Sequence, residues 1–323
     1  MGATTNRRRG CFARVRGDGP FVATDLFIAG CGYVGGALAR LALGRGLRVA
    51  ALTRNAARGA ELRAAGVKVL QADLAADDWH RELPAAPRWI VNCVSSGGGG
   101  VEGYRRSYVD GMASLLRWAE KAGPAGAILY TGSTSVYPQD GGQRVDEGSP
   151  TAADGERGAL LLEAERLLRE SPAAASRRFI LRLAGIYGPG RHHLLEQVRA
   201  GEVTGGSQHH LNLIHRDDAA DAILACLESP VGEGVHVYNA ADDAPTSKGE
   251  VAAWLAARLG VPKPRFTGVA HPARRAIVPD RLIVNARLRS ATGWRPRFPT
   301  FREGYESILS AAAAGAQSPA SPN

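Results

Sequence analysis

The stretch FIAGCGYVGGALARLALGRGLRVAALTRN, residues 27–55, carries the pattern that decides the fold. An apolar run leads into three glycines spaced as G-x-G-x-x-G, and apolar residues at helical spacing follow over residues 34–43. In such a strand, turn and helix, the first glycine permits a tight turn and the second lets the backbone approach a pyrophosphate. The third glycine lets the helix and the strand pack closely, and the helix N-terminus adds free N–H groups. We therefore expect a dinucleotide to contact the residues of this loop: Gly30, Gly32, Tyr33, Val34 and Gly35.

The apolar pattern continues through most of the chain. Apolar runs at residues 26–30, 47–52, 67–72, 89–94, 127–132 and 178–185 alternate with helical stretches such as 108–121 and 158–170. The runs are continuous rather than alternating, which is typical of parallel strands buried on both faces. The pattern predicts an α/β fold: a doubly wound parallel sheet of the Rossmann type.

The end of the second strand bears on the choice of cofactor. Folds that prefer NAD carry an acidic residue there, which accepts hydrogen bonds from the adenosine ribose. Here the strand ends in Thr53 and Arg54. No carboxylate repels a 2′-phosphate, and Arg54 can form charge-assisted hydrogen bonds with one. We therefore expect NADP, with NAD as the alternative. The alternative role for Arg54 is that of a solvated surface arginine.

Further cofactor contacts are expected where other strands end, because ligands bind at the carboxyl ends of parallel strands. Asp73 and Leu74 follow the third strand, and Val94 and Ser95 follow the fourth. The four glycines at 97–100 form a flexible segment along the path of the cofactor.

Composition excludes several classes of function. The chain has 323 residues and a net charge of +9, of which residues 1–20 contribute five arginines against one aspartate. No cluster of basic and aromatic residues indicates nucleic-acid binding, and no apolar run is long enough to span a membrane. Four scattered cysteines without a C-x-x-C pair indicate reduced thiols and a cytoplasmic location.

Several motifs together carry a family resemblance. They are GCGYVG (30–35), LYTGSTSVYP (129–138), ILRLAGIYGPGR (180–191), LIHRDDAADAI (213–223), YNAADDAPTS (238–247) and GWRPRFP (293–299). In this order they resemble the extended and atypical short-chain dehydrogenase/reductases, which include NAD(P)-dependent sugar epimerases and dehydratases. The resemblance covers residues 25–310. It implies an oxidoreductase or epimerase-like enzyme. It also implies that a smaller C-terminal α/β part binds a small polar or nucleotide-linked substrate.

The resemblance also implies a catalytic serine, tyrosine and lysine, and two of these are missing. The serine aligns with Ser133, whereas Arg157 stands at the tyrosine position and Leu161 at the lysine position. No tyrosine occurs between Tyr137 and Tyr187. Candidate catalytic residues are therefore Ser133, Tyr137 as a substitute acid, and Arg157 as an electrostatic clamp, because arginine stays protonated and cannot shuttle protons. The alternatives are a structural role for Ser133 at the end of a strand and a packing role for Tyr137.

The substrate side is less marked in the sequence. By resemblance, Ala184, Gly185 and Ile186 contact the nicotinamide. Polar candidates for gripping a substrate follow them: Arg191, His192 and Arg216, the last of which could instead pair with Asp217 or Asp218. Five histidines fall between 192 and 215, but adjacent histidines on a strand point to opposite faces, so we expect no metal site.

Residues 1–23 and 311–323 are expected to be disordered. Residues 24–190 should form the cofactor-binding core and residues 191–310 most of the substrate-binding part, with about 213–240 returning to the core. The helices at 108–121 and 158–170 would pair in a homodimer by resemblance, although burial within one chain explains their apolar residues equally well. The alternative to an enzyme is a non-catalytic NADP(H)-binding sensor or structural subunit.

Overall fold

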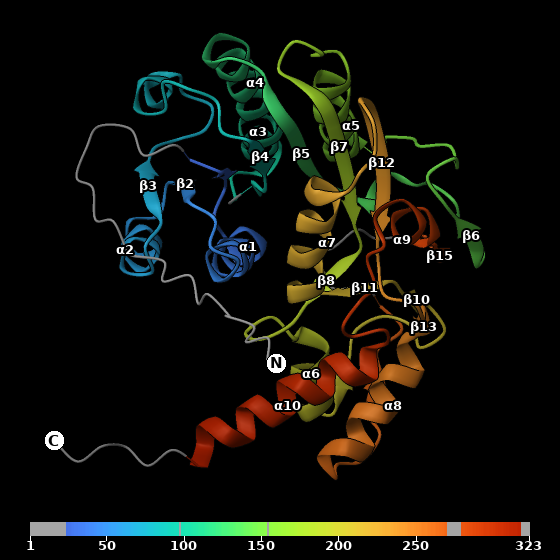
Figure 1. The fold of residues 1–323 in the computed structure, drawn as a ribbon. Coiled ribbons are helices and arrows are strands. Elements are labelled where there is room, and N and C mark those ends of the chain that lie inside the picture. Colours follow the sequence, from blue (N-terminus) through green and yellow to red (C-terminus); the bar gives the residue numbers. More distant parts are fainter. Residues whose placement is uncertain (1–23, 97, 154, 270–278, 318–323) are drawn as a thin grey trace, which may run out of the picture.

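Seven parallel strands form the central sheet in a computed structural model that describes residues 24–96, 98–153, 155–269 and 279–317, apart from the side chains of 312–317. Their order is β12-β7-β5-β4-β1-β2-β3 (Figure 1). The strand order runs outward in both directions from the β1–β4 pair, to β3 on one side and to β12 on the other. This arrangement confirms the doubly wound Rossmann fold. The strands are β1 (Leu26–Ala29), β2 (Val49–Thr53), β3 (Lys68–Gln71), β4 (Trp89–Asn92), β5 (Ala125–Ser133), β7 (Ala175–Leu183) and β12 (Gly234–Ala240).

Helices cover both faces of this sheet, because successive strand residues point to opposite sides. Leu26 and Ile28 of β1 belong to one apolar core, which includes α1, α2, α7 and α9. Phe27 and Ala29 belong to the other, with Trp79, α4 and α5. The helices are α1 (Tyr33–Gly44), α2 (Ala56–Ala64), α3 (Gly100–Tyr104), α4 (Gly111–Ala122), α5 (Gly155–Arg169), α7 (Arg216–Glu228) and α9 (Ala286–Thr292), with short turns η1 (Asp78–Glu82), η2 (Arg105–Asp110) and η3 (Thr134–Val136).

A third apolar core lies below the sheet in Figure 1 and joins α6 (His193–Arg199), α8 (Lys248–Leu259) and α10 (Phe301–Gln317). Short paired strands complete the fold. The pairs are β8 (Gly185–Tyr187) with β11 (Leu213–His215), β9 (Glu202–Val203) with β14 (Arg265–Phe266), β10 (His210–Leu211) with β13 (Thr246–Ser247), and β6 (Gln143–Val145) with β15 (Arg281–Ile283). After β11 the chain returns to the sheet through α7 and β12.

Two helices differ from the sequence-based expectation. Helix α10 continues to Gln317, past the start of the predicted tail at residue 311, because the alanine-rich segment there has high helix propensity. Residues 1–23 and 318–323 lie outside the described residues. The helix expected at 108–121 is preceded by α3 and by η2, a π-helical turn, so helical backbone begins at Gly100.

The apolar residues considered for a homodimer contact are largely buried within one chain. Leu115 and Leu116 of α4 and Leu160, Leu161 and Leu168 of α5 are all buried. Among the described residues, the large apolar side chains that stand exposed are Val101 and Val269. The homodimer stays a prediction, and burial in the monomer accounts for these leucines.

Candidate functional site

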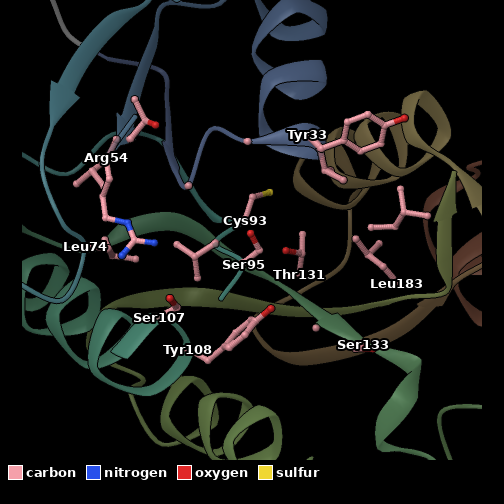
Figure 2. A pocket seen from close by; sticks show the side chains of 18 of the residues that line it. Tyr33, Arg54, Leu74, Cys93, Ser95, Ser107, Tyr108, Thr131, Ser133 and Leu183 are labelled. Atoms are coloured by element: carbon pink, nitrogen blue, oxygen red, sulfur yellow. The ribbon is translucent and has the colours of Figure 1, made fainter. Parts of the chain in front are cut away.

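A cavity of about 740 Å³ opens at the carboxyl ends of the central strands. This is the size and place expected of a cofactor site in a doubly wound fold. In Figure 2, Arg54 and Leu74 lie toward one end of the cavity and Leu183 toward the other. Fifteen of the predicted site residues line it: Gly30, Gly32, Tyr33, Val34, Thr53, Arg54, Asp73, Leu74, Val94, Ser95, Ser133, Ala184, Gly185, Ile186 and Arg191.

The three glycines of the first loop are needed for three different reasons. Gly30 has φ +84°, and a Cβ there would lie 2.6 Å from Val94 Cα. A Cβ on Gly35 would lie 2.5 Å from the carbonyl oxygen of Gly30, so Gly35 lets α1 pack against the loop without itself lining the cavity. A Cβ on Gly32 would meet no protein atom within 4 Å, although Gly32 lines the cavity. The space that Gly32 leaves open is therefore available to a ligand.

The N-terminus of α1 suits an anion. Gly32 stands at the N-cap position, so no side chain caps the helix, and the first turn contains no acidic residue. The first backbone N–H groups and the positive end of the helix dipole face this loop. These residues fit a dinucleotide pyrophosphate.

The adenosine end of the cavity carries a cluster of charges around Asp73. Arg106 Nε donates a hydrogen bond to Asp73 Oδ2 at 2.9 Å, and Arg54 Nη1 lies farther from the same oxygen, at 3.6 Å. Burial raises the pKa of Asp73, but hydrogen bonds from the Ala75 N–H and from Arg106 outweigh burial and lower it. The side chain of Arg54 is 51% exposed and only loosely paired, so it can turn toward a ligand.

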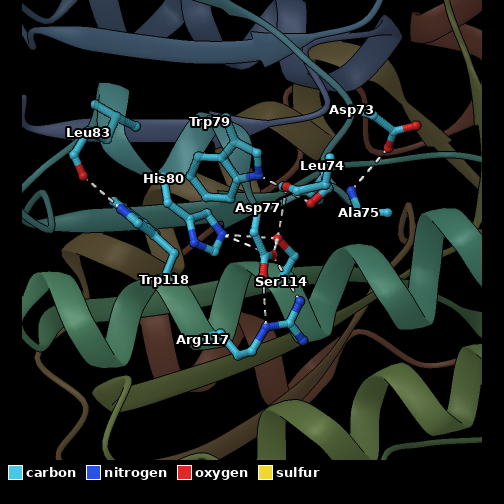
Figure 3. A network of polar contacts seen from close by, with 11 residues as sticks. Asp73, Leu74, Ala75, Asp77, Trp79, His80, Leu83, Ser114, Arg117 and Trp118 are labelled. Carbon is cyan, nitrogen blue, oxygen red and sulfur yellow. Dashed lines mark hydrogen bonds and ion pairs between the residues drawn. The ribbon is translucent and has the colours of Figure 1, made fainter.

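The loop that holds Asp73 and Leu74 is fastened to α4 by polar contacts (Figure 3). Asp77 accepts hydrogen bonds from Ser114 Oγ at 2.7 Å and from Arg117 Nη2 at 2.9 Å. These bonds, from Arg117 first and Ser114 next, lower the pKa of Asp77 to about 2. Trp79 Nε1 donates to the carbonyl oxygen of Leu74 at 3.3 Å. The loop is thus fixed in the free protein.

The opposite end of the cavity contains the hydroxyl groups of β5. Ser133 ends that strand, donates a hydrogen bond to Ser135 Oγ at 2.9 Å, and accepts one from the Ser135 N–H at 3.1 Å. It therefore caps η3 and also lines the cavity, so both readings of this serine agree with its place. Thr131 lies two residues earlier and donates to the carbonyl oxygen of Asn92.

Tyr137 does not lie at the cavity. Its side chain is 1% exposed, and its hydroxyl donates to Asn239 Oδ1 and accepts a hydrogen bond from Arg182. Burial raises the pKa of this phenol. The structure thus corrects the expectation of a substitute acid, because a group held in the core by two partners cannot reach a substrate.

Three other predicted residues also lie outside the cavity lining. Arg157 is exposed, and its guanidinium carbon lies 5.1 Å from the ring centre of Tyr104. His192 is the N-cap residue of α6, with Nδ1 3.5 Å from Glu196 Oε1. Arg216 stacks on Tyr33, hydrogen-bonds Asp217 at 2.8 Å, and lines a neighbouring hollow with Asp218. These three residues therefore do not line the cavity, although their predicted catalytic or substrate-binding roles require a contact there.

Sequence reasoning missed several residues of the lining: Leu52, Cys93, Ser107, Tyr108, Thr131, Gly132 and Leu183. Most of them adjoin predicted residues at the strand ends, and that adjacency could have identified them. Tyr108 is different, because it comes from the helical segment after the glycine run. The pair Tyr104 and Tyr108, one helical turn apart, is the signal that could have indicated it.

The described residues also bear on metal binding and on membrane crossing. The part of the chain that the structure describes holds no group of three or more His, Cys, Asp or Glu side chains placed to bind a metal ion. Within the same residues, no helix combines the length and the apolar character needed to cross a membrane.

Comparison with known proteins gives the class to which this fold and cavity belong. The NAD dependent epimerase/dehydratase family matches residues 26–241, so the chain belongs to that family. The motifs quoted from the sequence and the family match therefore agree.

Three relatives illustrate this membership. Protein YeeZ of Escherichia coli (strain K12) is 33% identical over 158 residues, which are 49% of this chain and 55% of YeeZ, so the chain matches about half the length of that relative. The 3-diazoavenalumate denitrifying reductase of a Streptomyces species is 28% identical over 219 residues, 62% of this chain and 70% of the reductase. A solved structure from Methylobacillus flagellatus, described as an NAD-dependent epimerase/dehydratase, is 30% identical with a TM-score of 0.69, and the match covers 90% of this chain and 99% of that one.

Proposed function

We propose that this protein is an NADP(H)-dependent oxidoreductase acting on a small polar or nucleotide-linked substrate. The observation that carries the proposal is the cavity itself, whose lining includes Arg54 as well as Gly32, where open space adjoins the uncapped N-terminus of α1. A dinucleotide bound there supplies or accepts a hydride. The chain has to bind and orient it, and to bring a substrate to its reactive end.

The preference for NADP rests on the charges near Arg54. Arg106 holds Asp73 by the shorter contact, which leaves Arg54 free to bind a 2′-phosphate. The guanidinium can form charge-assisted hydrogen bonds with that phosphate, and no other carboxylate lines this end of the cavity within the described residues. NAD lacks the phosphate and gains nothing from Arg54.

Substrate binding is assigned to the end that contains Ser133 and Arg191. Ser133 has a hydroxyl at the cavity surface that can hydrogen-bond a carbonyl or hydroxyl oxygen. Arg191 is exposed at the rim, with its guanidinium carbon 5.6 Å from the ring centre of Tyr33. Its fixed positive charge suits a polar or anionic substrate.

A second candidate is an NADP(H)-binding protein without turnover. It is favoured by Leu161, which is 7% exposed and stands where the resemblance implies a catalytic lysine. We favour the enzyme because the cavity extends beyond the cofactor loop to the polar groups of β5 and the rim.

A screen of carbonyl and sugar substrates separates the two candidates. Purified protein is mixed with NADPH and with each compound of a panel of aldehydes, ketones, quinones and nucleotide sugars, and the near-ultraviolet absorbance of NADPH is followed. A substrate-dependent loss of NADPH that Ser133→Ala reduces supports the enzyme. Tight NADPH binding without turnover of any compound in the panel would support the sensor instead.

A further inference from the structure

The cavity is lined by a tyrosine that stands at a different position in the chain from the catalytic tyrosine of the family. Two tyrosines line it, Tyr33 and Tyr108. Tyr33 lies beside the phosphate loop and donates its hydroxyl to the carbonyl oxygen of Pro189 at 3.0 Å. Tyr108 lies on the wall that Thr131 and Ser133 share, and Figure 2 shows its hydroxyl pointing toward that side of the cavity.

A local irregularity of the backbone places Tyr108 in the cavity. It belongs to η2, a π-helical turn of six residues between two α-helical segments. Such turns shift the direction of the following side chains and occur frequently at functional sites. Ser107, the preceding residue of the same turn, also lines the cavity.

Tyr104 packs against the ring of Tyr108, and Arg157 in turn packs against Tyr104. The rings of Tyr104 and Tyr108 lie 5.2 Å apart, within the range of favourable aromatic pairs. Arg157 covers Tyr104 at 5.1 Å, in the geometry of a cation–π contact. The arginine that stands at the family's tyrosine position thus supports, through Tyr104, a tyrosine on another helix.

We infer that Tyr108 is the proton donor of this site and replaces the tyrosine absent from α5. The inference rests on the proposed function. In the step it serves, the carbonyl carbon of a substrate accepts a hydride from NADPH, which is oxidised to NADP⁺. The electron pair of the C=O π bond moves to oxygen, the phenolic O–H bond of Tyr108 breaks, and its proton goes to that oxygen. The resulting phenolate regains a proton from water.

The surroundings of Tyr108 favour donation over abstraction of a proton. Burial, followed by the neighbouring Tyr104, raises the pKa of Tyr108 to about 12, and a hydrogen bond with the backbone of Ser96 acts in the opposite direction. The lysine that would lower the pKa is replaced by the apolar Leu161. A phenol that stays protonated at neutral pH can protonate an alkoxide, but it is a poor base for oxidising an alcohol. The protonated state of Tyr108 thus agrees with the reductive step proposed for it.

The test compares Tyr108→Phe with Tyr238→Phe, a matched variant that loses the hydroxyl of a tyrosine on β12, outside the cavity lining. Both proteins and the wild type are made with 3-fluorotyrosine, and Tyr108→Phe assigns one fluorine signal among the eight tyrosines. Addition of NADP⁺ should shift that signal along the same saturation curve that calorimetry gives for binding. A Tyr108 signal that does not move at saturating NADP⁺ would overturn the inference.

Turnover is then measured with 4-nitrobenzaldehyde, 9,10-phenanthrenequinone and any compound found in the substrate screen. Tyr108→Phe should bind NADPH as the wild type does and lose at least about 100-fold in kcat, the usual contribution of a positioned acid. Tyr238→Phe should keep its kcat. If the wild type consumes NADPH and Tyr108→Phe has the same kcat, the role of Tyr108 is refuted and the proposed function stands. A wild type that binds no NADPH, or reduces none of these compounds, refutes the proposed function together with it.

Discussion

Gly32 and Gly35 stand three residues apart in the same loop, yet a side chain would have different consequences at the two positions. Around Gly32 there is open space that we assign to the pyrophosphate, whereas Gly35 touches the backbone of Gly30. One glycine is needed by the ligand and the other by the fold. Substitutions can separate these needs.

Gly32→Val should fold with the thermal stability of the wild type and lose cofactor binding, because its side chain would occupy the phosphate position. Gly35→Val should be destabilised, because its Cβ would meet the Gly30 carbonyl oxygen at 2.5 Å. Thermal unfolding and calorimetric titration with NADPH measure both effects. If Gly32→Val binds NADPH normally, the assignment of this loop is wrong.

Arg54→Glu should weaken NADPH binding far more than NADH binding, by about 10-fold or more. The substitution removes a charge-assisted hydrogen bond, whose contribution is about 1.5–3 kcal/mol, and adds a repelling charge. Arg63→Glu on the exposed face of α2 controls for the change in net charge. Equal losses for the two cofactors would show that Arg54 does not contact the 2′-phosphate.

At the scale of elements, a buried ion pair joins α5 to β7. Arg182 donates to both oxygens of Glu165, at 2.9 and 2.7 Å, and both side chains are at most 5% exposed. The same guanidinium donates to Tyr137 at 2.8 Å. This network fixes α5 on the sheet and explains why Tyr137 is unavailable to the cavity.

Glu165→Leu should lower the free energy of unfolding by about 3–5 kcal/mol, because it leaves the Arg182 cation buried without its partner. The double variant Glu165→Leu/Arg182→Met should regain most of that loss. Urea unfolding of the three proteins measures the effect. A single variant as stable as the wild type would mean that the pair does not hold α5 in place.

The sequence predicted the sheet and the cofactor loop well because both depend on local pattern. Continuous apolar runs identified the strands, and the glycine spacing identified the turn at Gly30. Residues whose role depends on where the side chain points were harder to predict. Tyr137 follows a strand end, as ligand-binding residues do, but its side chain turns into the core toward Arg182 and Asn239.

Tyr108 escaped prediction for a related reason. Glycines at 97–100 read as a loop, whereas helical backbone begins at Gly100. The π-helical turn then changes the phase of the side chains, and helical periodicity counted from residue 108 onward cannot show that change. Arg157 and Tyr104 come together only in the folded chain.

At the scale of the whole molecule, buried carboxyl groups lie where the central sheet meets the smaller C-terminal part. Burial, together with the nearby carboxylates of Asp243, Asp218 and Glu303, raises the pKa of Asp242 to about 8. Burial also raises the pKa of Asp218 to about 6, although it accepts hydrogen bonds from the N–H groups of Phe298 and Arg297. Asp242 thus binds a proton more tightly in the folded protein than in the unfolded chain.

A folded-state pKa above the unfolded value contributes stability that is complete below the unfolded value and is lost as pH rises through the folded value. For Asp242 that window runs from 3.8 to about 8. The melting temperature should therefore fall between pH 6 and pH 9, and Asp242→Asn should flatten this dependence. Asp78→Asn, on the exposed turn η1, should not. A wild-type melting temperature that rises over this range would contradict the assignment.

The central claim is that the cavity holds a dinucleotide and prefers the phosphorylated form. Calorimetric titration of the purified protein with NADPH and with NADH, at physiological salt, tests it most directly. We predict one site per chain and an affinity for NADPH at least about 10-fold above that for NADH, a difference of about 1.4 kcal/mol. Binding of neither cofactor would contradict the claim and leave the fold as a scaffold without its expected ligand.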